Sequence, residues 1–334
     1  MLQKKLENRK NPPLNCIMEV LMEKEKKFYE RLEQKGVSRR SFMKYCTFLT
    51  ASMGLSSSYV PRVTEVFAAP IQRPPVIWLN FAECTGCTEA FLRSSYPFPD
   101  DLILEILSVE YHETIMAAAG HQAEENLQEA VKKYNGKFVC VVEGAIATKY
   151  DGAYGKIRGR TFLEIAKDVC PKAAAVICLG TCSSYGGIQA AKPNPGGYKG
   201  VGDALGMKTV NIPGCPPNPV NLVGTVVNYL LFGRLPKIDD LGRPDFAYGK
   251  SVHDQCPRRS HFENEEFVTR FGSQEAAQGY CLYKMGCKGP ETYNNCPVAK
   301  FNDGTSWPVE AGHPCLGCSE PDFWDKMTPF FEEM

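Results

Sequence analysis

Cysteine spacing is the feature that most constrains how this chain can fold. Of its 15 cysteines, six lie in the last eighty or so residues together with one well-spaced histidine. They follow the pattern His253-x2-Cys256-x24-Cys281-x5-Cys287-x8-Cys296-x18-Cys315-x2-Cys318. Soft thiolates at this density favour iron–sulfur clusters or zinc over hard cations. We therefore expect the C-terminal part of the chain to bind metal.

The N-terminal segment has the form of an export leader. Residues 38–44, Ser-Arg-Arg-Ser-Phe-Met-Lys, match a twin-arginine motif, a mildly apolar stretch follows at 47–60, and Ala68-Ala69 offers a cleavage site. We expect residues 1–69 to be a twin-arginine signal peptide with an extended N-terminus. The alternative is a basic turn before a short helix. About forty residues precede the arginines, so either a misplaced start or a chaperone-binding extension is implied.

Export to the periplasm limits what the cysteines can be, because bare thiols oxidise there. A metal-loaded protein that is exported already folded resolves this difficulty. The net charge is zero and no basic run follows the leader, which argues against nucleic acid as a partner. The longest later apolar run, 221–233, is shorter than the ~20 residues of a membrane span. We expect no membrane span.

After the leader, the sequence divides into two parts. Residues 70–238 alternate apolar runs, expected as buried strands, with amphipathic stretches, expected as helices, which indicates an α/β domain with a flavodoxin-like parallel sheet. The expected strands are 76–81, 104–109, 138–142, 174–179 and 209–212, and the expected helices are 123–134, 161–169 and 219–232. Residues 239–334 lack strand-like runs and contain short helical pieces such as 265–271. A segment so poor in core residues rarely folds on hydrophobic burial alone, and metal ligation can supply the missing free energy.

Four cysteines follow the expected strands of the first domain. Cys84 and Cys87 come after the first strand, Cys182 after 174–179 and Cys215 after 209–212. Ligands bind beyond the carboxyl ends of the strands in an open parallel sheet. Four thiols at one edge suit a 4Fe–4S cluster, and the glycines beside them let backbone N–H groups approach sulfur.

Other interpretations of these cysteines are a pair of disulfides, a zinc site or unrelated core residues. Cys140 and Cys178 lie inside expected strands and Cys170 closes a helix, so all three are interpreted as packing residues. Cys16 and Cys46 would leave with the leader. Glu83 and Glu143 lie at strand ends, where we interpret them as groups at an interface or around the cluster, with a role in proton relay as the alternative.

Seven ligand candidates remain in the second domain. In chain order they form a four-ligand set and a three-ligand set: His253, Cys256, Cys281 and Cys287, and then Cys296, Cys315 and Cys318. One imidazole with three thiolates can hold a cubane, and three thiolates suit a 3Fe–4S cluster. Zinc is the alternative for the four-ligand set, because three cysteines and a histidine make a conventional site.

Specific motifs give the chain a resemblance to a known family. They are Glu-Cys-Thr-Gly-Cys at 83–87, Val-Glu-Gly-Ala-Ile at 142–146, Gly-Thr-Cys at 180–182, Pro-Gly-Cys-Pro-Pro at 213–217, and Trp-Pro-Val-Glu-Ala-Gly-His-Pro-Cys-Leu-Gly-Cys-Ser-Glu-Pro at 307–321. From leader to C-terminus, the sequence resembles the small, electron-transfer subunits of periplasmic nickel–iron hydrogenases.

The resemblance implies a cofactor for each cysteine set. Cys84, Cys87, Cys182 and Cys215 would hold a proximal 4Fe–4S cluster, Cys296, Cys315 and Cys318 a medial 3Fe–4S cluster, and His253, Cys256, Cys281 and Cys287 a distal 4Fe–4S cluster. Pro308 stands where a fourth medial thiol would be. Gly86 and Gly187 stand where oxygen-tolerant relatives have two extra cysteines, which implies an oxygen-sensitive enzyme.

The resemblance also implies the reaction and the partners. The chain would pair as a heterodimer with a large subunit that holds the nickel–iron centre. It would pass electrons between that centre and a c-type cytochrome, of the c3 kind, during reversible oxidation of H2. Two rival functions are a zinc- or disulfide-stapled binding protein and a flavin-binding electron carrier. Iron content and flavin absorbance distinguish them.

Overall fold

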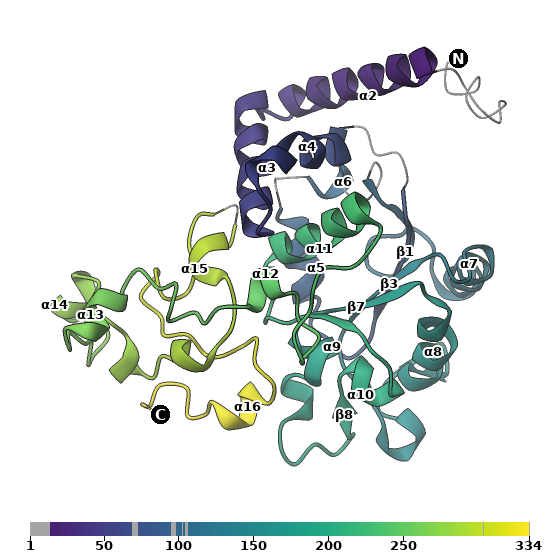
Figure 1. Cartoon of the computed structure of the whole chain (residues 1–334). Helices are drawn as coiled ribbons and strands as arrows, with labels where there is room; N and C mark the ends of the chain where they lie inside the picture. Colours follow the sequence, from purple (N-terminus) through teal and green to yellow (C-terminus); the bar gives the residue numbers. More distant parts are fainter. Residues whose placement is uncertain are drawn as a thin grey trace.

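Five parallel strands form the central sheet of the protein (Figure 1). The computed structural model describes residues 14–68, 73–94, 98–101, 103, 106–302 and 304–333. The strand order is β2-β1-β3-β7-β9, with β1 Pro75–Asn80, β2 Ser108–His112, β3 Val139–Glu143, β7 Ala175–Leu179 and β9 Val210–Ile212. All neighbouring pairs are parallel. This is the flavodoxin-like order, so the predicted α/β fold is confirmed.

Four strands lie within one residue of their predicted ends, and one prediction is wrong. The second strand was expected at 104–109 but spans 108–112, and residues 104 and 105 lie outside the described residues. Tyr111 and His112 pair with Ile77 and Trp78, and the His112 ring lies 4.7 Å from that of Trp78. Backbone pairing therefore extends the strand past the apolar run, into residues whose polarity gave no strand signal.

Side chains alternate between the two faces of the sheet, and each face has its own helices. Trp78 and Val141 face a core with α5 Gly86–Leu92 and α11 Pro219–Phe232. Ile77 and Cys140 face a core with α7 Gly120–Lys133, α8 Phe162–Val169 and α10 Val201–Leu205. The predicted helices 123–134, 161–169 and 219–232 are thus confirmed as α7, α8 and α11.

Short elements complete the first domain. They are α6 Pro99–Asp101, β4 Ile146–Ala147, β5 Lys156–Ile157, β6 Arg160–Thr161, α9 Thr181–Tyr185 and β8 Tyr198–Lys199, with 3-10 turns at Lys149–Gly152, Cys170–Lys172 and Ile188–Ala190. Strands β4 and β8 pair antiparallel, as do β5 and β6.

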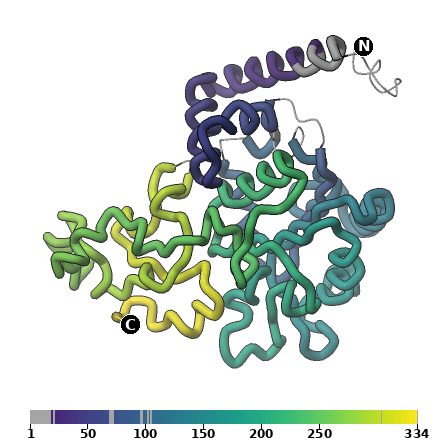
Figure 2. The backbone as a smooth tube through the Cα atoms, in the orientation of Figure 1, coloured from purple at the N-terminus to yellow at the C-terminus, as the bar shows by residue number. Residues whose placement is uncertain are grey.

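The segment expected as a leader is helical and packs on the α11 side of the sheet (Figure 2). It forms α2 Leu14–Gln34, α3 Arg39–Ser52, a 3-10 turn at Ser57–Tyr59, and α4 Val60–Ala68. Phe42, Leu49 and Phe67 are buried in the same core as Val223 and Val227 of α11. Ala69 of the expected cleavage site lies outside the described residues, and the export role of the segment stays a prediction.

The C-terminal region lies beside the sheet and is irregular, as predicted (Figure 2). Its elements are α12 Asp245–Tyr248, α13 Arg259–Glu263, α14 Gln274–Ala277, 3-10 turns at Tyr283–Met285 and Gly289–Glu291, α15 Cys296–Ala299 and α16 Phe323–Lys326. The helix predicted at 265–271 is wrong. Glu265 has φ 58°, and Phe267 forms a bridge with Cys281.

Two small apolar clusters stabilise this region, one around Trp307 and one around Phe323 and Trp324. In the part of the chain that the structure describes, no helix combines the length and apolarity needed to cross a membrane.

Candidate metal centres at the sheet edge and in the C-terminal region

The carboxyl edge of the sheet brings the first four cysteines together. Cys84 and Cys87 lie at the start of α5 after β1, Cys182 lies on α9 after β7, and Cys215 follows β9. The thiols of Cys84, Cys182 and Cys215 all act electrostatically on Cys87. The side chains that we predicted at three separate strand ends therefore form one group.

Glycines make room for these sulfur atoms. A Cβ at Gly180 would lie 2.5 Å from Cys87 Sγ, and one at Gly187 would lie 2.5 Å from Cys182 Sγ. Both glycines also have positive φ, 92° and 65°, a conformation that other residues rarely adopt. The two glycines thus leave space around the thiols that any larger side chain would fill.

Burial makes the Cys87 and Cys182 thiols poor anions unless a cation is present. It raises the pKa of Cys182 to about 12, and the neighbouring Cys215 thiol contributes to the rise. Burial, Glu143 and the three neighbouring thiols raise the pKa of Cys87 well above its usual range. Four thiols gathered at one sheet edge suit metal ions, whose positive charge stabilises the thiolate form. This donor set fits an iron–sulfur cluster.

Glu143 holds the loop that carries two of these cysteines. This carboxylate, 1% exposed at the end of β3, accepts the backbone N–H groups of Cys87 at 3.0 Å and Thr88 at 3.2 Å. The Thr88 hydroxyl donates to it at 2.5 Å. Glu143 therefore caps the first turn of α5. Glu83 is different: burial and the charge of Glu143 raise its pKa to about 7.

A second group lies in the C-terminal region, beside Cys215 of the sheet edge. Cys296 begins α15, and Cys315 and Cys318 follow in an irregular loop. Their thiols act on one another electrostatically, and burial raises the pKa of each. A cavity of about 740 Å³ is lined by these cysteines together with Cys215 and Trp307.

This cavity is far larger than the ~10–15 Å³ that a single water molecule needs on the same measure. Trp307, which lines the cavity, has a buried Nε1 donor without a partner among the described residues. Pro308 also lines the cavity, which agrees with its expected place beside the medial site. Size and donor set fit a cluster.

The third group lies in the C-terminal region away from the sheet. His253, Cys256, Cys281 and Cys287 line one small cavity. The pKa of His253 is lowered by burial and by Arg259, which favours the neutral imidazole that ligation requires. Phe267 pairs with Cys281 through the bridge that replaces the predicted helix. This local departure from the sequence pattern therefore lies at a ligand candidate.

The other cysteines behave as core residues. Cys46, Cys140, Cys170 and Cys178 are buried, and Cys140, Cys170 and Cys178 lie in the same apolar core. No disulfide occurs among the cysteines of the described ranges, so the disulfide alternative finds no support there. Nor do any three of the described histidine, cysteine, aspartate and glutamate side chains converge as around a single metal ion.

The sequence did not reveal several buried polar side chains that lie near the cysteines. Thr181, Asn221 and Asn295 are buried, as are Arg243 and Glu320. Four of them lie within six residues of a candidate ligand in the sequence. Arg243 does not, and its position alone gave no signal. Thr181 and Glu320 do lie within the motifs Gly-Thr-Cys and Cys-Ser-Glu-Pro, which were the available signals.

The fold and these sites define an α/β protein with a thiol-rich sheet edge and a cysteine-rich C-terminal region. Residues 248–331 match the family model for the C-terminal part of the NiFe/NiFeSe hydrogenase small subunit. Residues 84–229 match that of the NADH ubiquinone oxidoreductase 20 kDa subunit.

Known proteins match over most of the chain. The periplasmic [NiFe] hydrogenase small subunit 1 of Nitratidesulfovibrio vulgaris is 54% identical over 91% of this chain and 96% of its own length. The periplasmic [NiFe] hydrogenase small subunit of Solidesulfovibrio fructosivorans is 55% identical with the same coverage, 91% and 96%. The crystal structure of the reduced, active Ni-Fe-Se hydrogenase from Desulfomicrobium baculatum matches with TM-score 0.73 and 37% identity, over 79% of this chain and 100% of that one.

The chain belongs to the family of nickel–iron hydrogenase small subunits. It is therefore a subunit of an oxidoreductase that acts on H2.

Proposed function

We propose that this chain is the electron-transfer subunit of its hydrogenase and holds three iron–sulfur clusters. Cys84, Cys87, Cys182 and Cys215 hold a proximal 4Fe–4S cluster, Cys296, Cys315 and Cys318 a medial 3Fe–4S cluster, and His253, Cys256, Cys281 and Cys287 a distal 4Fe–4S cluster. The observation that carries the proposal is the grouping of these ligands into three adjacent sets. Clusters in such sites supply one-electron redox chemistry.

The residues of the chain give each site its properties. Thiolates and one imidazole hold iron, while buried walls lower the local dielectric and so tune the potentials. Gly180 and Gly187 leave space for sulfur, and Glu143 fixes the Cys84–Cys87 loop through backbone N–H groups. The domains 70–238 and 239–334 then carry the proximal site and the other two sites respectively.

The partners follow from the family and from the position of the sites. A large subunit with the nickel–iron centre forms a heterodimer with this chain and carries out the reversible oxidation of H2. The distal set lies away from the sheet, where a c3-type cytochrome is the external acceptor. The names of the relatives, which include the words small subunit, support the heterodimer.

Export to the periplasm by the twin-arginine route completes the proposal. Its support is the Ser38–Lys44 motif and the word periplasmic in the names of two relatives. Residues 1–69 are the leader in this proposal. Gly86 and Gly187 stand where oxygen-tolerant relatives would have extra cysteines. For this reason we predict that the enzyme is sensitive to oxygen.

Iron and acid-labile sulfide analysis of anaerobically purified heterodimer tests the assignment of the clusters. Two cubanes and one three-iron cluster require about eleven iron atoms in this chain beyond those of the large subunit. Cys296→Ala should lose about three of them, because it removes one of only three medial thiolates. The matched control, Cys178→Ala, removes a buried core thiol and should retain all iron. Zinc in place of iron, or equal loss in both variants, would contradict the proposal.

A further inference from the structure

Neighbouring ligand sets contact each other through the two cysteines of the 315–318 loop. Cys215 of the proximal set and Cys318 of the medial set line one cavity. The backbone N–H of Cys315 in turn donates to Cys287 Sγ of the distal set at 3.4 Å. An N–H···S hydrogen bond therefore joins the medial set to the distal set.

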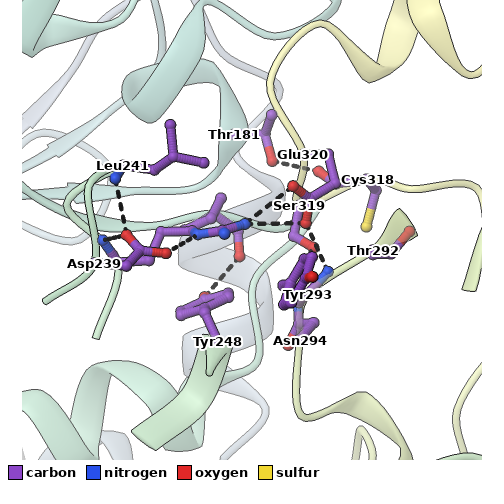
Figure 3. Close-up of polar contacts among 12 residues, drawn as sticks. Thr181, Asp239, Leu241, Tyr248, Thr292, Tyr293, Asn294, Cys318, Ser319 and Glu320 are labelled. Atoms are coloured by element: carbon purple, nitrogen blue, oxygen red, sulfur yellow. Dashed lines mark hydrogen bonds and ion pairs between the residues drawn. The ribbon is translucent and has the colours of Figure 1, made fainter. Parts of the chain in front are cut away.

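At each junction, a hydrogen bond reaches the carbonyl group of the medial cysteine. The Lys288 N–H donates to the Cys315 carbonyl at 2.8 Å. The Thr181 hydroxyl donates to the Cys318 carbonyl, toward which it points in Figure 3. The 315–318 loop is thus fixed to the proximal side by a side chain and to the distal side by the backbone. The hydrogen bond on the proximal side comes from a side chain, so a single substitution can remove it.

Thr181 joins three ligand-bearing loops at once. It precedes Cys182, and its hydroxyl accepts the Gly214 N–H at 2.9 Å beside Cys215. Its own backbone N–H donates to the Gly214 carbonyl at 3.0 Å. The side chain is 1% exposed, so water does not replace a hydroxyl lost here. Thr181 thus accepts one hydrogen bond from Gly214 and donates another to it, which gives this contact a defined geometry.

A buried ion pair holds the far end of the same loop. Arg243, on the chain between β9 and α12, donates from Nε to Asp239 at 2.8 Å and from Nη1 to Glu320 at 3.0 Å. Glu320 lies two residues after Cys318 and also accepts the Tyr293 N–H at 2.7 Å. Figure 3 shows Asp239, Tyr293 and Glu320 converging between the two domains. Because Arg243 is buried, the pair has few alternative partners.

A reciprocal amide pair makes the third link. Asn221 of α11 donates to Asn295 Oδ1 at 3.2 Å, and Asn295 donates back to Asn221 Oδ1 at 2.8 Å. Asn221 follows Cys215 in the chain, and Asn295 immediately precedes Cys296. Both side chains are buried. This link connects a proximal ligand loop to the medial ligand that the 315–318 loop does not carry.

We propose that these three contacts form a polar brace of positioning residues that sets the separation of the proximal and medial ligand sets, and so the rate at which electrons cross between them. The brace comprises Thr181, the Asn221–Asn295 pair and the Arg243–Glu320 pair. It rests on the proposed function, because it requires clusters in both sets. Satisfied buried polar networks favour one arrangement, whereas apolar contacts alone would allow the two domains to slide. The brace acts through the ligand loops and contacts no substrate.

Thr181→Val in the anaerobically purified heterodimer tests the brace, with Thr181→Ser as the conservative rescue. The matched control is Thr148→Val, which removes a part-buried hydroxyl-to-carbonyl bond of 2.6 Å within the first domain. Two rates are measured, the rate of dye reduction driven by H2 and the rate of isotope exchange between H2 and deuterated water. Their ratio is compared between variants, because the isotope exchange requires the large subunit alone. In Thr181→Val this ratio should fall, and Thr181→Ser should restore it. Thr148→Val should match the wild-type ratio.

Two readouts do not depend on turnover. Amide exchange at Gly214 should rise about fivefold in Thr181→Val, the equivalent of one ordinary hydrogen bond. The magnetic interaction between the proximal and medial centres, observed by electron paramagnetic resonance, should change in Thr181→Val and not in Thr148→Val. A change in protein stability alone would not alter that interaction.

The brace is overturned if Thr181→Val keeps the wild-type ratio and magnetic interaction, or if Thr148→Val changes them equally. If Thr181→Val lacks its full iron, Arg243→Lys decides: one ammonium group cannot reproduce the guanidinium contacts to both Asp239 and Glu320, so the ratio should fall with iron retained. A wild-type ratio in Arg243→Lys overturns the proposal. Failure of the proposed function is separate, because it appears as missing iron in the wild-type protein.

Discussion

Glu143 shows how a single buried carboxylate can organise a candidate metal site. It ends β3, yet its hydrogen bonds go to backbone N–H groups at the start of α5, which follows β1. Helix N-termini leave such groups without partners, and a carboxylate satisfies them through charge-assisted bonds. The neighbouring strand therefore holds the Cys84–Cys87 loop in place.

Glu143→Gln should loosen this loop. A glutamine keeps an oxygen that can accept both N–H groups, as Oε1 of Glu143 does from Cys87 at 3.0 Å and from Thr88 at 3.3 Å, but it removes the negative charge that strengthens these bonds. Hydrogen bonds to charged groups contribute about 1.5–3 kcal/mol and neutral ones about 1 kcal/mol, so amide exchange at these residues should rise roughly fivefold. Hydrogen exchange followed by mass spectrometry measures it. Exchange unchanged at Cys87 and Thr88, with Glu89→Gln as an exposed control, would contradict this role.

At the residue scale, the sequence predicts ligands better than their supports. Cys182 and Cys215 could be placed at one edge because each follows an apolar run that is typical of a strand. Thr181 contacts Cys318 across 137 positions, and Arg243 contacts Glu320 across 77. No local pattern encodes contacts of that range, so the polar brace emerges only when the two domains are packed together.

Helix α8 shows an element whose ends the sequence does encode. Thr161 accepts the Glu164 N–H at 3.1 Å, and the Glu164 carboxylate accepts the Thr161 N–H at 2.6 Å. This capping box satisfies two otherwise free donors. Its residues, threonine followed three positions later by glutamate, stand in the sequence, and the predicted helix began at Thr161.

Thr161→Ala should destabilise the first domain by about 1 kcal/mol, since it removes the cap while keeping the helix-forming residues. The free energy of unfolding, measured by urea denaturation, checks this. Thr161→Ser keeps the oxygen atom and should restore most of the loss. Equal stability of the alanine variant and the wild type would show that tertiary packing alone determines where α8 begins.

The elements that were predicted wrongly have long-range causes. Strand β2 continues to His112 because β1 pairs with it, although the apolar run ends earlier. The helix expected at 265–271 is replaced by a bridge between Phe267 and Cys281. Both segments have a local pattern that competes with a contact to a distant strand or loop, and the contact prevails.

At the scale of the whole molecule, the N-terminal helices cover the face of the sheet that carries α11. Phe42 and Phe67, with ring centroids 5.9 Å apart, lie in the same core as Val223 and Val227. If residues 1–69 are removed as a leader, that core loses one of its layers. Strand order and the helices of the opposite face do not depend on it.

Deletion of residues 1–68 should therefore uncover apolar surface on the isolated chain. Each fully buried large apolar side chain contributes about 1.5–3 kcal/mol, so losing the contacts of α3 and α4 should lower the free energy of unfolding and increase binding of a hydrophobic dye. Deletion of residues 1–13, which precede α2, is the control and should change neither. Deletion of residues 1–35 should give an intermediate result, because it removes Phe28 and Leu32 from this core but leaves α3 and α4 on α11. Dye fluorescence equal in the full chain and the 1–68 deletion would show that these helices do not cover α11 in solution.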